Sequence, residues 1–308
     1  MRAHVLHVVG LVLALSLGPA SAQSGAGRFF DDFSDADLAG LRAAGWTVRT
    51  APGHPGVPGA QWGESQLRLV DDPAQKGNRL LRLVAETDGT GPGTRQAQLC
   101  QRRKFFEGTY AARIRFSDAP VQGADGDPVI QTFYAVAPLR HDFDPEFSEI
   151  DWEYLPNGGW GSEKTRLYGI SWQTVRIEPW LAYNGSHEEP GALGAGDAAW
   201  HVLLMQVAGG RVRLFLDGRP VAEHGGRNYP VVPMSINFNQ WFSPGGLLPA
   251  GGPARRYEQD VDWVFHARNE VLSPAQVESA VAAYRRAGVA REDRVPPLLA
   301  DLDSRCDF

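Results

Sequence analysis

The stretch from Ser148 to Leu155, SEIDWEYL, alternates acidic side chains with large apolar ones. Successive side chains of a β-strand point to opposite faces, so a strand here places Glu149, Asp151 and Glu153 on one face and apolar groups on the other. Like charges held this close repel each other, and folding alone gives little reason to gather them. Cleavage of a glycosidic bond is a reason to gather carboxylates, because one carboxyl group must donate a proton and another must attack the sugar or activate water.

Short runs of the same kind recur along the chain and are separated by turn-forming clusters, with Gly 35 and Pro 22 in the composition. The clearest runs are 66–70, 79–85, 109–116, 129–136, 149–154, 165–172, 201–207, 211–216, 234–241 and 261–266. Runs 201–207 and 211–216 predict a hairpin, followed by an Asp217-Gly218 turn. So many strands without intervening helices predict an all-β sandwich of two packed antiparallel sheets.

A helical pattern closes the chain. Ser273 is a good N-cap, Pro274 suits the first turn, and Gly288 is a plausible stop. Apolar residues between them repeat at helical spacing, at Val277, Ala280, Val281 and Tyr284. We therefore expect a sandwich domain over 23–271, then a helix and tail over 272–308 that pack on it. Residues 183–199 are interpreted as a Gly- and Ala-rich insertion.

Composition and the N-terminus suggest an exported protein. The 308 residues are 43% hydrophobic, and the net charge of -6 offers no basic surface for nucleic acid. Residues 1–22 resemble a signal peptide, with Arg2, an apolar run over 8–17 and a small-residue cleavage site. No other segment is long and apolar enough to cross a membrane. We expect a secreted or periplasmic protein, and a monomer, although the sequence carries no direct signal for its oligomeric state.

Cys100 and Cys306 are the only cysteines. In an oxidising compartment they could pair and tie the C-terminal tail to the domain. Two unpaired thiols are an equally good interpretation, because the sequence does not set the distance between them.

The spacing of the carboxylates suits one mechanism. The Cα atoms of Glu149 and Glu153 are roughly 13 Å apart along a strand, and two inward-leaning side chains could narrow the gap between their carboxyl groups to the roughly 5–5.5 Å of a retaining glycosidase. Asp151 between them can hydrogen-bond a neighbour, and the three should titrate as a coupled set. The alternative is an alternating edge strand with a solvated acidic face.

The run from Glu149 to Glu153 resembles the active-site signature of glycoside hydrolase family 16, the laminarinase and lichenase group. Other parts resemble that family in the same order around it: 29–33, 106–114, 200–218, 234–241 and 260–264. The resemblance implies a β-jelly roll of two curved antiparallel sheets, concanavalin A-like, with a cleft on the concave face. It also implies an endo-acting, retaining hydrolase of β-1,3 or mixed β-1,3-1,4 glucan, with Glu149 as nucleophile, Glu153 as general acid/base and Asp151 assisting.

Two departures from that pattern leave the substrate open. Gln206-Val207 stand where the family has an acidic residue and Trp, and Phe147-Ser148 stand where lichenases have Trp-Asp. Within the family, a galactan such as agar or carrageenan, or transfer to another sugar, remains an alternative. A jelly-roll carbohydrate-binding protein without catalysis is a third, but the complete set of carboxylates argues against it.

Sugar sites combine aromatic platforms with amides and carboxylates. In run 234–241 one face carries Asn237, Asn239 and Trp241, and the resemblance puts the last two in the cleft. The further candidates for substrate contact are Trp172, Tyr168, Tyr134, Phe147 and Gln98. For any single aromatic, core packing is the alternative.

Glycoside hydrolysis by carboxylates requires no cofactor. The resemblance also implies a structural calcium away from the cleft, with Asp262 as a ligand. A hard cation needs several oxygen ligands and Asp262 is one, so a surface charge is the competing interpretation. The sequence contains no nucleophile-elbow serine motif, no zinc-binding HExxH and no phosphate-binding loop.

Overall fold

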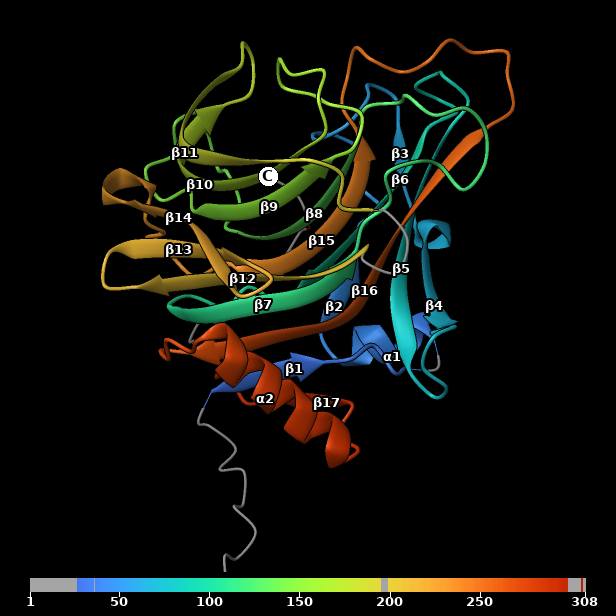
Figure 1. The fold of residues 1–308 in the computed structure, drawn as a ribbon. Helices are drawn as coiled ribbons and strands as arrows, with labels where there is room; N and C mark the ends of the chain where they lie inside the picture. Colours follow the sequence, from blue (N-terminus) through green and yellow to red (C-terminus); the bar gives the residue numbers. More distant parts are fainter. Residues whose placement is uncertain (1–26, 36, 195–198, 299–305, 307–308) are drawn as a thin grey trace, which may run out of the picture.

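The computed structural model describes residues 27–35, 37–194, 199–298 and 306, and shows two curved β-layers with a helix on one outer face (Figure 1). The predicted signal segment, 1–22, lies outside the described residues. No helix in the described part of the chain is long and apolar enough to cross a membrane.

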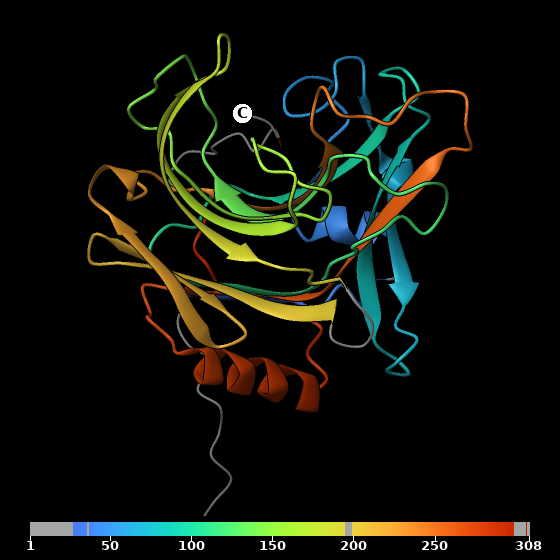
Figure 2. The ribbon, with the colours of Figure 1, turned by 45° about the horizontal axis from the view of Figure 1, so that its top comes forward.

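One layer is an antiparallel sheet of seven strands in which β9 is an interior strand. Its strands are, in spatial order, β2 (Trp46–Val48), β6 (Arg95–Gln101), β15 (Ser235–Phe242), β8 (Val129–Val136), β9 (Glu149–Leu155), β10 (Arg166–Arg176) and β11 (Leu181–Pro190). Figure 2 shows the concave side of this sheet facing away from the second layer. We call it the concave sheet.

The second layer is also mainly antiparallel and is built around β16. Its successive neighbours on one side are β7 (Gly108–Arg115), β12 (Trp200–Ala208), β13 (Arg211–Leu216) and β14 (Arg219–Gly225). On the other side, the first half of β16 (Arg255–Arg268) pairs with β5 (Arg79–Thr87) and its second half pairs with β1 (Arg28–Asp31). β5 pairs in turn with β4 (Leu67–Asp71), and β1 pairs with β17 (Arg291–Asp293). The pair Glu86–Arg95 connects this layer to β6, which also pairs in parallel with the short β3 (Gln61–Trp62).

The main core lies between the two layers. The concave sheet contributes every second side chain of its strands, among them Ile150 and Trp152 of β9, both fully buried. Tyr110 of β7 and Met205 of β12 meet them from the other layer. Since side chains alternate across a strand, the remaining residues of the concave sheet point into the open groove.

The C-terminal helix forms as predicted. Helix α2 (Pro274–Arg286) starts with a capping box between Ser273 and Gln276. Val277 and Val281 bury their side chains against Leu204 and Phe265 on the outer face of the second layer. Figure 2 shows α2 on the opposite side of the molecule from β9 and β10, so it takes no part in the concave surface. A shorter helix, α1 (Leu38–Ala43), precedes β2.

The predicted strands are confirmed, most with ends shifted by one to four residues, and the hairpin of β12 and β13 is present. Seven strands lie outside the predicted runs, namely β1, β2, β3, β6, β11, β14 and β17. Strand β6 is almost fully buried, and β11 is exposed along most of its length. The interpretation of 183–199 as an insertion is therefore wrong for its first part, because β11 pairs with β10 along ten positions from Leu181 to Pro190.

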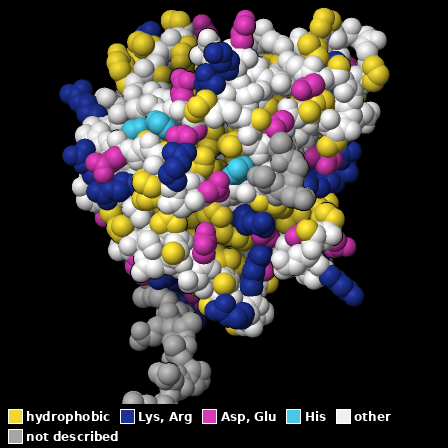
Figure 3. Space-filling model, in the orientation of Figure 1, with side chains coloured by type: hydrophobic (Ala, Val, Ile, Leu, Met, Phe, Trp, Pro, Cys, Tyr) yellow, Lys and Arg dark blue, Asp and Glu magenta, His cyan; other side chains and the backbone are white. Residues whose placement is uncertain are grey.

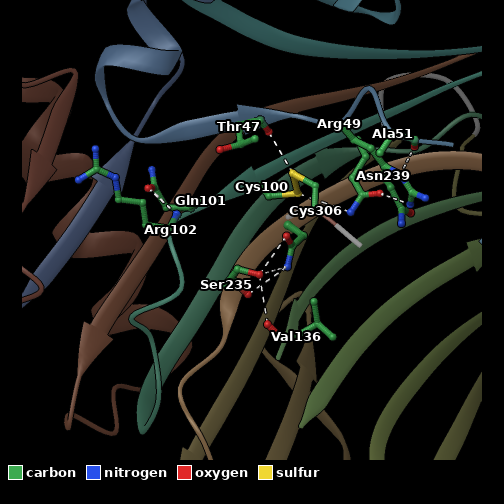
Figure 4. Close-up of a disulfide and its surroundings, with 12 residues drawn as sticks. Thr47, Arg49, Ala51, Cys100, Gln101, Arg102, Val136, Ser235, Asn239 and Cys306 are labelled. Atoms are coloured by element: carbon green, nitrogen blue, oxygen red, sulfur yellow. Dashed lines mark hydrogen bonds between the residues drawn. A yellow bond between two sulfur atoms is a disulfide. The ribbon is translucent and has the colours of Figure 1, made fainter. Parts of the chain in front are cut away.

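Cys100 and Cys306 form a disulfide, which decides between the two alternatives that the sequence left open (Figure 4). Cys100 lies on β6 in the concave sheet, and the Cys306 sulfur also contacts the Thr47 carbonyl oxygen on β2 at 3.2 Å. The chain is thus closed by a cross-link between positions 206 residues apart.

Candidate active site

Strand β9 brings the three carboxylates together on the concave face. Its apolar side chains, Ile150, Trp152 and Tyr154, are fully buried in the main core, which leaves Glu149, Asp151 and Glu153 on the opposite side. β9 pairs with β8 and β10 along most of its length, so the register of all three is set from both sides. The alternation expected from the sequence is therefore confirmed, although β9 is an interior strand and not a solvated edge.

The carboxylates form part of the lining of a cavity of about 1130 Å³. The cavity has aromatic walls from β10, β15 and the loops beside them, in which Trp172, Tyr168 and Trp241 take part. Five carboxylates line it and, among its described lining residues, there is no Lys or Arg. Figure 3 shows hydrophobic side chains in the middle of the face that is seen in Figure 1, with acidic, basic and histidine side chains around them.

Burial makes the three carboxyl groups hold protons unusually strongly. It is the first cause of the raised pKa at Glu149, Asp151 and Glu153, and it raises the pKa of Asp151 to about 8. Repulsion by Asp151 raises the pKa of both glutamates further. Each of the three also has one buried oxygen without a hydrogen-bond partner among the described residues.

One hydrogen bond and the closeness of the three carboxyl groups organise this set. The Trp172 indole N–H donates to Asp151 Oδ2, which opposes the rise of the Asp151 pKa. The neighbouring Asp151 raises the pKa of Glu149, whereas Glu149 lowers the pKa of Asp151. The raised pKa of each of the three groups favours its protonated form, and this suits Glu153 to the donation of a proton.

Five of the expected sugar-contacting residues line the cavity: Asn239, Trp241, Trp172, Tyr168 and Tyr134. The Asn239 side chain is held by Thr132, whose hydroxyl donates to Asn239 Oδ1 at 2.6 Å, and Asn239 Nδ2 donates to the Tyr134 hydroxyl at 3.2 Å. Trp241 Nε1 is buried and has no partner in the described part of the chain, so it is an available donor for a sugar hydroxyl.

Three of the expected contacts lie elsewhere. Asn237 is on the predicted face but is fully buried, and its amide donates to Ser235 at 2.9–3.0 Å. Phe147 is buried in a small apolar cluster and lines a different cavity, next to Phe143. Gln98 accepts from Arg49 and donates to Tyr134, so its amide supports the cavity wall from behind.

Asp262 does not suit a calcium site. Its side chain is fully buried, its Oδ1 accepts from Arg285 and from Asn78, and its Oδ2 accepts from Arg113. A cation would have to displace two guanidinium groups, and no cluster of three or more His, Cys, Asp or Glu that could hold a metal occurs in the part of the chain that the structure describes. The competing interpretation as a surface charge is wrong as well, because Asp262 is an internal ion-pair partner of α2 and β7.

Sequence reasoning missed part of the cavity wall. Trp160 and Trp180 line it and are 46% and 54% exposed, and the loop 52–61, with His54, lines it too. Burial and the nearby Arg49 lower the pKa of His54 to about 4, so this imidazole is neutral near pH 7. A large aromatic residue in a polar segment next to a predicted strand, such as Trp180, could have indicated this part of the cavity wall from the sequence.

Comparison with known proteins places the fold. No protein-family profile matches the sequence, and no curated protein matches it. Among solved structures, the Bacillus licheniformis β-glucanase is 16% identical, with a TM-score of 0.54 over 80% of this chain and 100% of that one. A glycoside hydrolase family 16 endo-glucanase from Bacteroides ovatus is 16% identical, with a TM-score of 0.57 over 78% and 99%.

The κ-carrageenase from Pseudoalteromonas carrageenovora, which was solved with an oligotetrasaccharide of κ-carrageenan, is 16% identical, with a TM-score of 0.51 over 82% of this chain and 98% of that one. Such low identities show the fold and not the activity. The protein therefore has the β-jelly roll of the β-glucanases, as the sequence predicted.

Proposed function

We propose that this protein is a retaining glycoside hydrolase that cleaves a β-linked polysaccharide by double displacement. The observation that carries the proposal is the placement of Glu149, Asp151 and Glu153 on one face of an interior strand, in the floor of an aromatic-walled cavity. Burial of three neighbouring carboxyl groups costs folding free energy, and the cleavage of a glycosidic bond uses two of them directly and can use the third to set their charge.

In the first step, a carboxylate oxygen of Glu149 attacks the anomeric carbon while Glu153 gives its proton to the leaving glycosidic oxygen. The bond from the anomeric carbon to that oxygen breaks as the bond to Glu149 forms. In the second step, Glu153 takes a proton from water, the resulting hydroxide oxygen bonds to the anomeric carbon, and Glu149 leaves as a carboxylate.

Asp151 has a positioning and charge-setting role in this scheme. Attack requires Glu149 to be ionised, so in this scheme Asp151 holds a proton when the sugar is bound and adds no negative charge beside the nucleophile. The raised pKa of Asp151, about 8, allows Asp151 to hold that proton near neutral pH. The Trp172 indole N–H holds Asp151 in place through a hydrogen bond to its Oδ2 atom.

The charge of the cavity favours an uncharged polymer. Glu178 and Glu188 line it together with the three carboxylates, and no lining residue that the structure describes is Lys or Arg. A sulfated galactan would meet repulsion without a cationic partner. We therefore infer a β-1,3 or mixed β-1,3-1,4 glucan as substrate, with uncharged agarose as the second candidate, and we propose endo-cleavage as the sequence resemblance implies.

Incubation of the purified protein with laminarin, lichenan, agarose and κ-carrageenan tests the proposal. We expect oligosaccharides from laminarin or lichenan, with the β-anomer formed first when the reaction is followed by proton NMR. Binding to these polymers without any product would favour the carbohydrate-binding alternative, and an initial α-anomer would exclude double displacement. The disulfide and the signal-like N-terminus support a secreted or periplasmic location, which fractionation of the host cells would test.

A further inference from the structure

A second cavity lies on the opposite face of β10 and β11 from the carboxylates. Its volume is about 600 Å³, which is an ordinary size for a small-ligand site. On β11, Tyr183 lines it, whereas the neighbouring Ala182 and Asn184 line the main cavity. Its other walls come from the loop 143–147 and from the segment 227–231, which follows β14. The two cavities therefore share a wall and open on different sides of it.

A β-bulge in β10 turns two consecutive polar residues toward this second cavity. The register of β10 against β11 shifts between Trp172 and Thr174, so Gln173 is an extra residue in the strand. Gln173 and Thr174 both line the second cavity, and Trp172 and Val175 on either side of them line the main one. The Gln173 amide is half-buried and has no hydrogen-bond partner among the described residues. It is therefore available to a ligand.

An aromatic wall stands beside this amide. Phe143 has a φ of 57°, a left-handed conformation that a bulky residue rarely adopts and that is concentrated at functional sites. Its backbone N–H donates to the Val175 carbonyl oxygen at 2.9 Å, which holds it against β10. The ring of Tyr183, which is 49% exposed, has its centre 6.0 Å from that of Phe143. Aromatic faces with a free amide between strands are the elements of a sugar site.

The charge of the second cavity is opposite to that of the main one. Arg227 is the one charged residue among its described lining residues, and in the described part of the chain its guanidinium has no ion pair and no hydrogen bond. The main cavity has five carboxylates and, among its described lining residues, no Lys or Arg. A guanidinium without a partner is suited to bind a carboxylate through two parallel hydrogen bonds.

We propose that the second cavity binds a uronic acid unit of an acidic polysaccharide. The sugar carboxylate pairs with Arg227, a face of the sugar ring stacks on Tyr183, and a hydroxyl group bonds to the Gln173 amide. A neutral glucan would leave the guanidinium without a partner, so charge separates the ligand of this cavity from the substrate of the main one. The inference goes beyond the proposed function, because it adds a polymer that the protein holds without cleaving it.

Calorimetric titration of the wild-type protein with two trisaccharides is the first test. Trigalacturonate carries the carboxylates, and maltotriose is a neutral chain with the same α-1,4 linkage. Neither contains the β-linkage that the proposed hydrolase would cut. We expect trigalacturonate to bind at least about tenfold more tightly, and its affinity to fall as the salt concentration rises. No binding of trigalacturonate, or equal affinity for both trisaccharides, would overturn the inference.

Variants of the cavity wall locate the binding. Arg227→Gln and Tyr183→Ala should each weaken trigalacturonate binding by about tenfold, with unchanged melting temperatures because both side chains lie at the surface. Arg211→Gln, at an exposed arginine of β13 that lines neither cavity, is the matched control and should bind like the wild type. Undiminished binding by Arg227→Gln, or an equal loss in Arg211→Gln, would overturn the inference.

The test is independent of the proposed hydrolysis. Glu149→Ala, which removes the proposed nucleophile, should bind trigalacturonate with wild-type affinity. Arg227→Gln should in turn release oligosaccharides from lichenan at the wild-type rate. Loss of trigalacturonate binding in Glu149→Ala would place the acidic sugar in the main cavity and overturn this inference, whereas an inactive wild-type protein that binds trigalacturonate would overturn only the proposed hydrolysis.

Discussion

The Trp172 indole nitrogen on β10 donates a hydrogen bond to Asp151 Oδ2 on β9, in the middle of the carboxylate cluster. This bond favours the ionised form of Asp151, while burial favours the neutral form more strongly. Trp172 thus has two roles, as an aromatic wall of the cavity and as the donor that limits the rise of the Asp151 pKa.

Trp172→Phe should separate these roles, because it keeps an aromatic ring and removes the donor. The pKa of Asp151 should rise further, and the proton that it holds should persist to higher pH. A hydrogen bond to a charged group contributes about 1.5 kcal/mol or more, so the alkaline limb of the kcat/KM profile should move up by about one pH unit. An unchanged alkaline limb together with a higher KM would show that Trp172 only stacks on the substrate and does not affect the pKa of Asp151.

Glu149→Ala and Glu153→Ala should each reduce turnover to below about one per cent of wild type, because nucleophile and proton donor are both required. Fold and sugar binding should be retained, since neither carboxylate takes part in the core. Circular dichroism and the retardation of the variants in gels that contain lichenan measure these properties. Turnover above that level in both variants would favour the binding-protein alternative.

Buried carboxyl groups also affect stability. The folded-state pKa of Asp151, about 8, lies above its unfolded value near 4, so the folded protein binds more protons between these two pH values. The free energy of unfolding contributed by this group is therefore fully present below about pH 4 and is lost as pH rises toward 8. Asp151→Asn should stabilise the protein at pH 8 by about 2 kcal/mol or more and have little effect at pH 4.

Denaturant unfolding at the two pH values measures this difference, and Asp144→Asn is a control of opposite sign. The Arg140 side chain holds the pKa of Asp144 well below its usual range. The stability that this ion pair contributes is present above about pH 4 and is lost in acid, so its removal should destabilise the protein at neutral pH. Equal effects of both variants at pH 8 would contradict the assignment of a protonated Asp151.

The sequence predicts interior strands of this structure better than edge strands, because burial on one face imposes an alternation of apolar and polar residues. Strand β9 has a neighbouring strand on each side and a packed core beneath it, so its apolar and acidic residues separate cleanly by face. Strand β11 lies at the edge of the concave sheet, with exposed side chains on one face and half-buried side chains on the other. It carries no apolar alternation, and only its pairing with β10 identifies it as a strand.

The residues that were misassigned depend on long-range pairing. Asn237 shares a face with Asn239 and Trp241, as the alternation predicted, but it pairs with Cys100 of β6 and is fully buried. Asp262 looked like a surface residue next to Trp263 because its partners, Arg113 and Arg285, are distant in the chain. A single sequence contains neither the register of β6 against β15 nor the position of α2.

Asp262→Asn should destabilise the fold without altering the reaction. The substitution leaves two arginines without a charged partner, but both are partly solvated, so we expect a loss of about 2 kcal/mol in the free energy of unfolding. Glu223→Gln, which removes an exposed ion pair with Arg213, should lower it by less than about 1 kcal/mol. Calcium or a chelator should leave the melting temperature of the wild type unchanged, and a calcium-dependent rise would restore Asp262 as a candidate ligand.

Trp180→Ala should weaken polysaccharide binding at the end of the cavity that β11 lines. Trp180 is 54% exposed and packs at right angles to Trp172, so its removal takes away a stacking surface and leaves the core intact. We expect KM for long glucans to rise about tenfold, with kcat and the melting temperature almost unchanged, because the indole lies away from the carboxylates.

Tyr183→Ala is the matched control for this variant. Tyr183 is 49% exposed and only three residues further along the chain. Its side chain lines the second cavity, next to Phe143, on the face of β11 opposite to the main cavity, so it should not contact a polysaccharide bound at the carboxylates. Its KM should equal that of the wild type. If both variants raise KM equally, the polysaccharide also contacts the outer face of β11, and the groove is not the sole route for the chain.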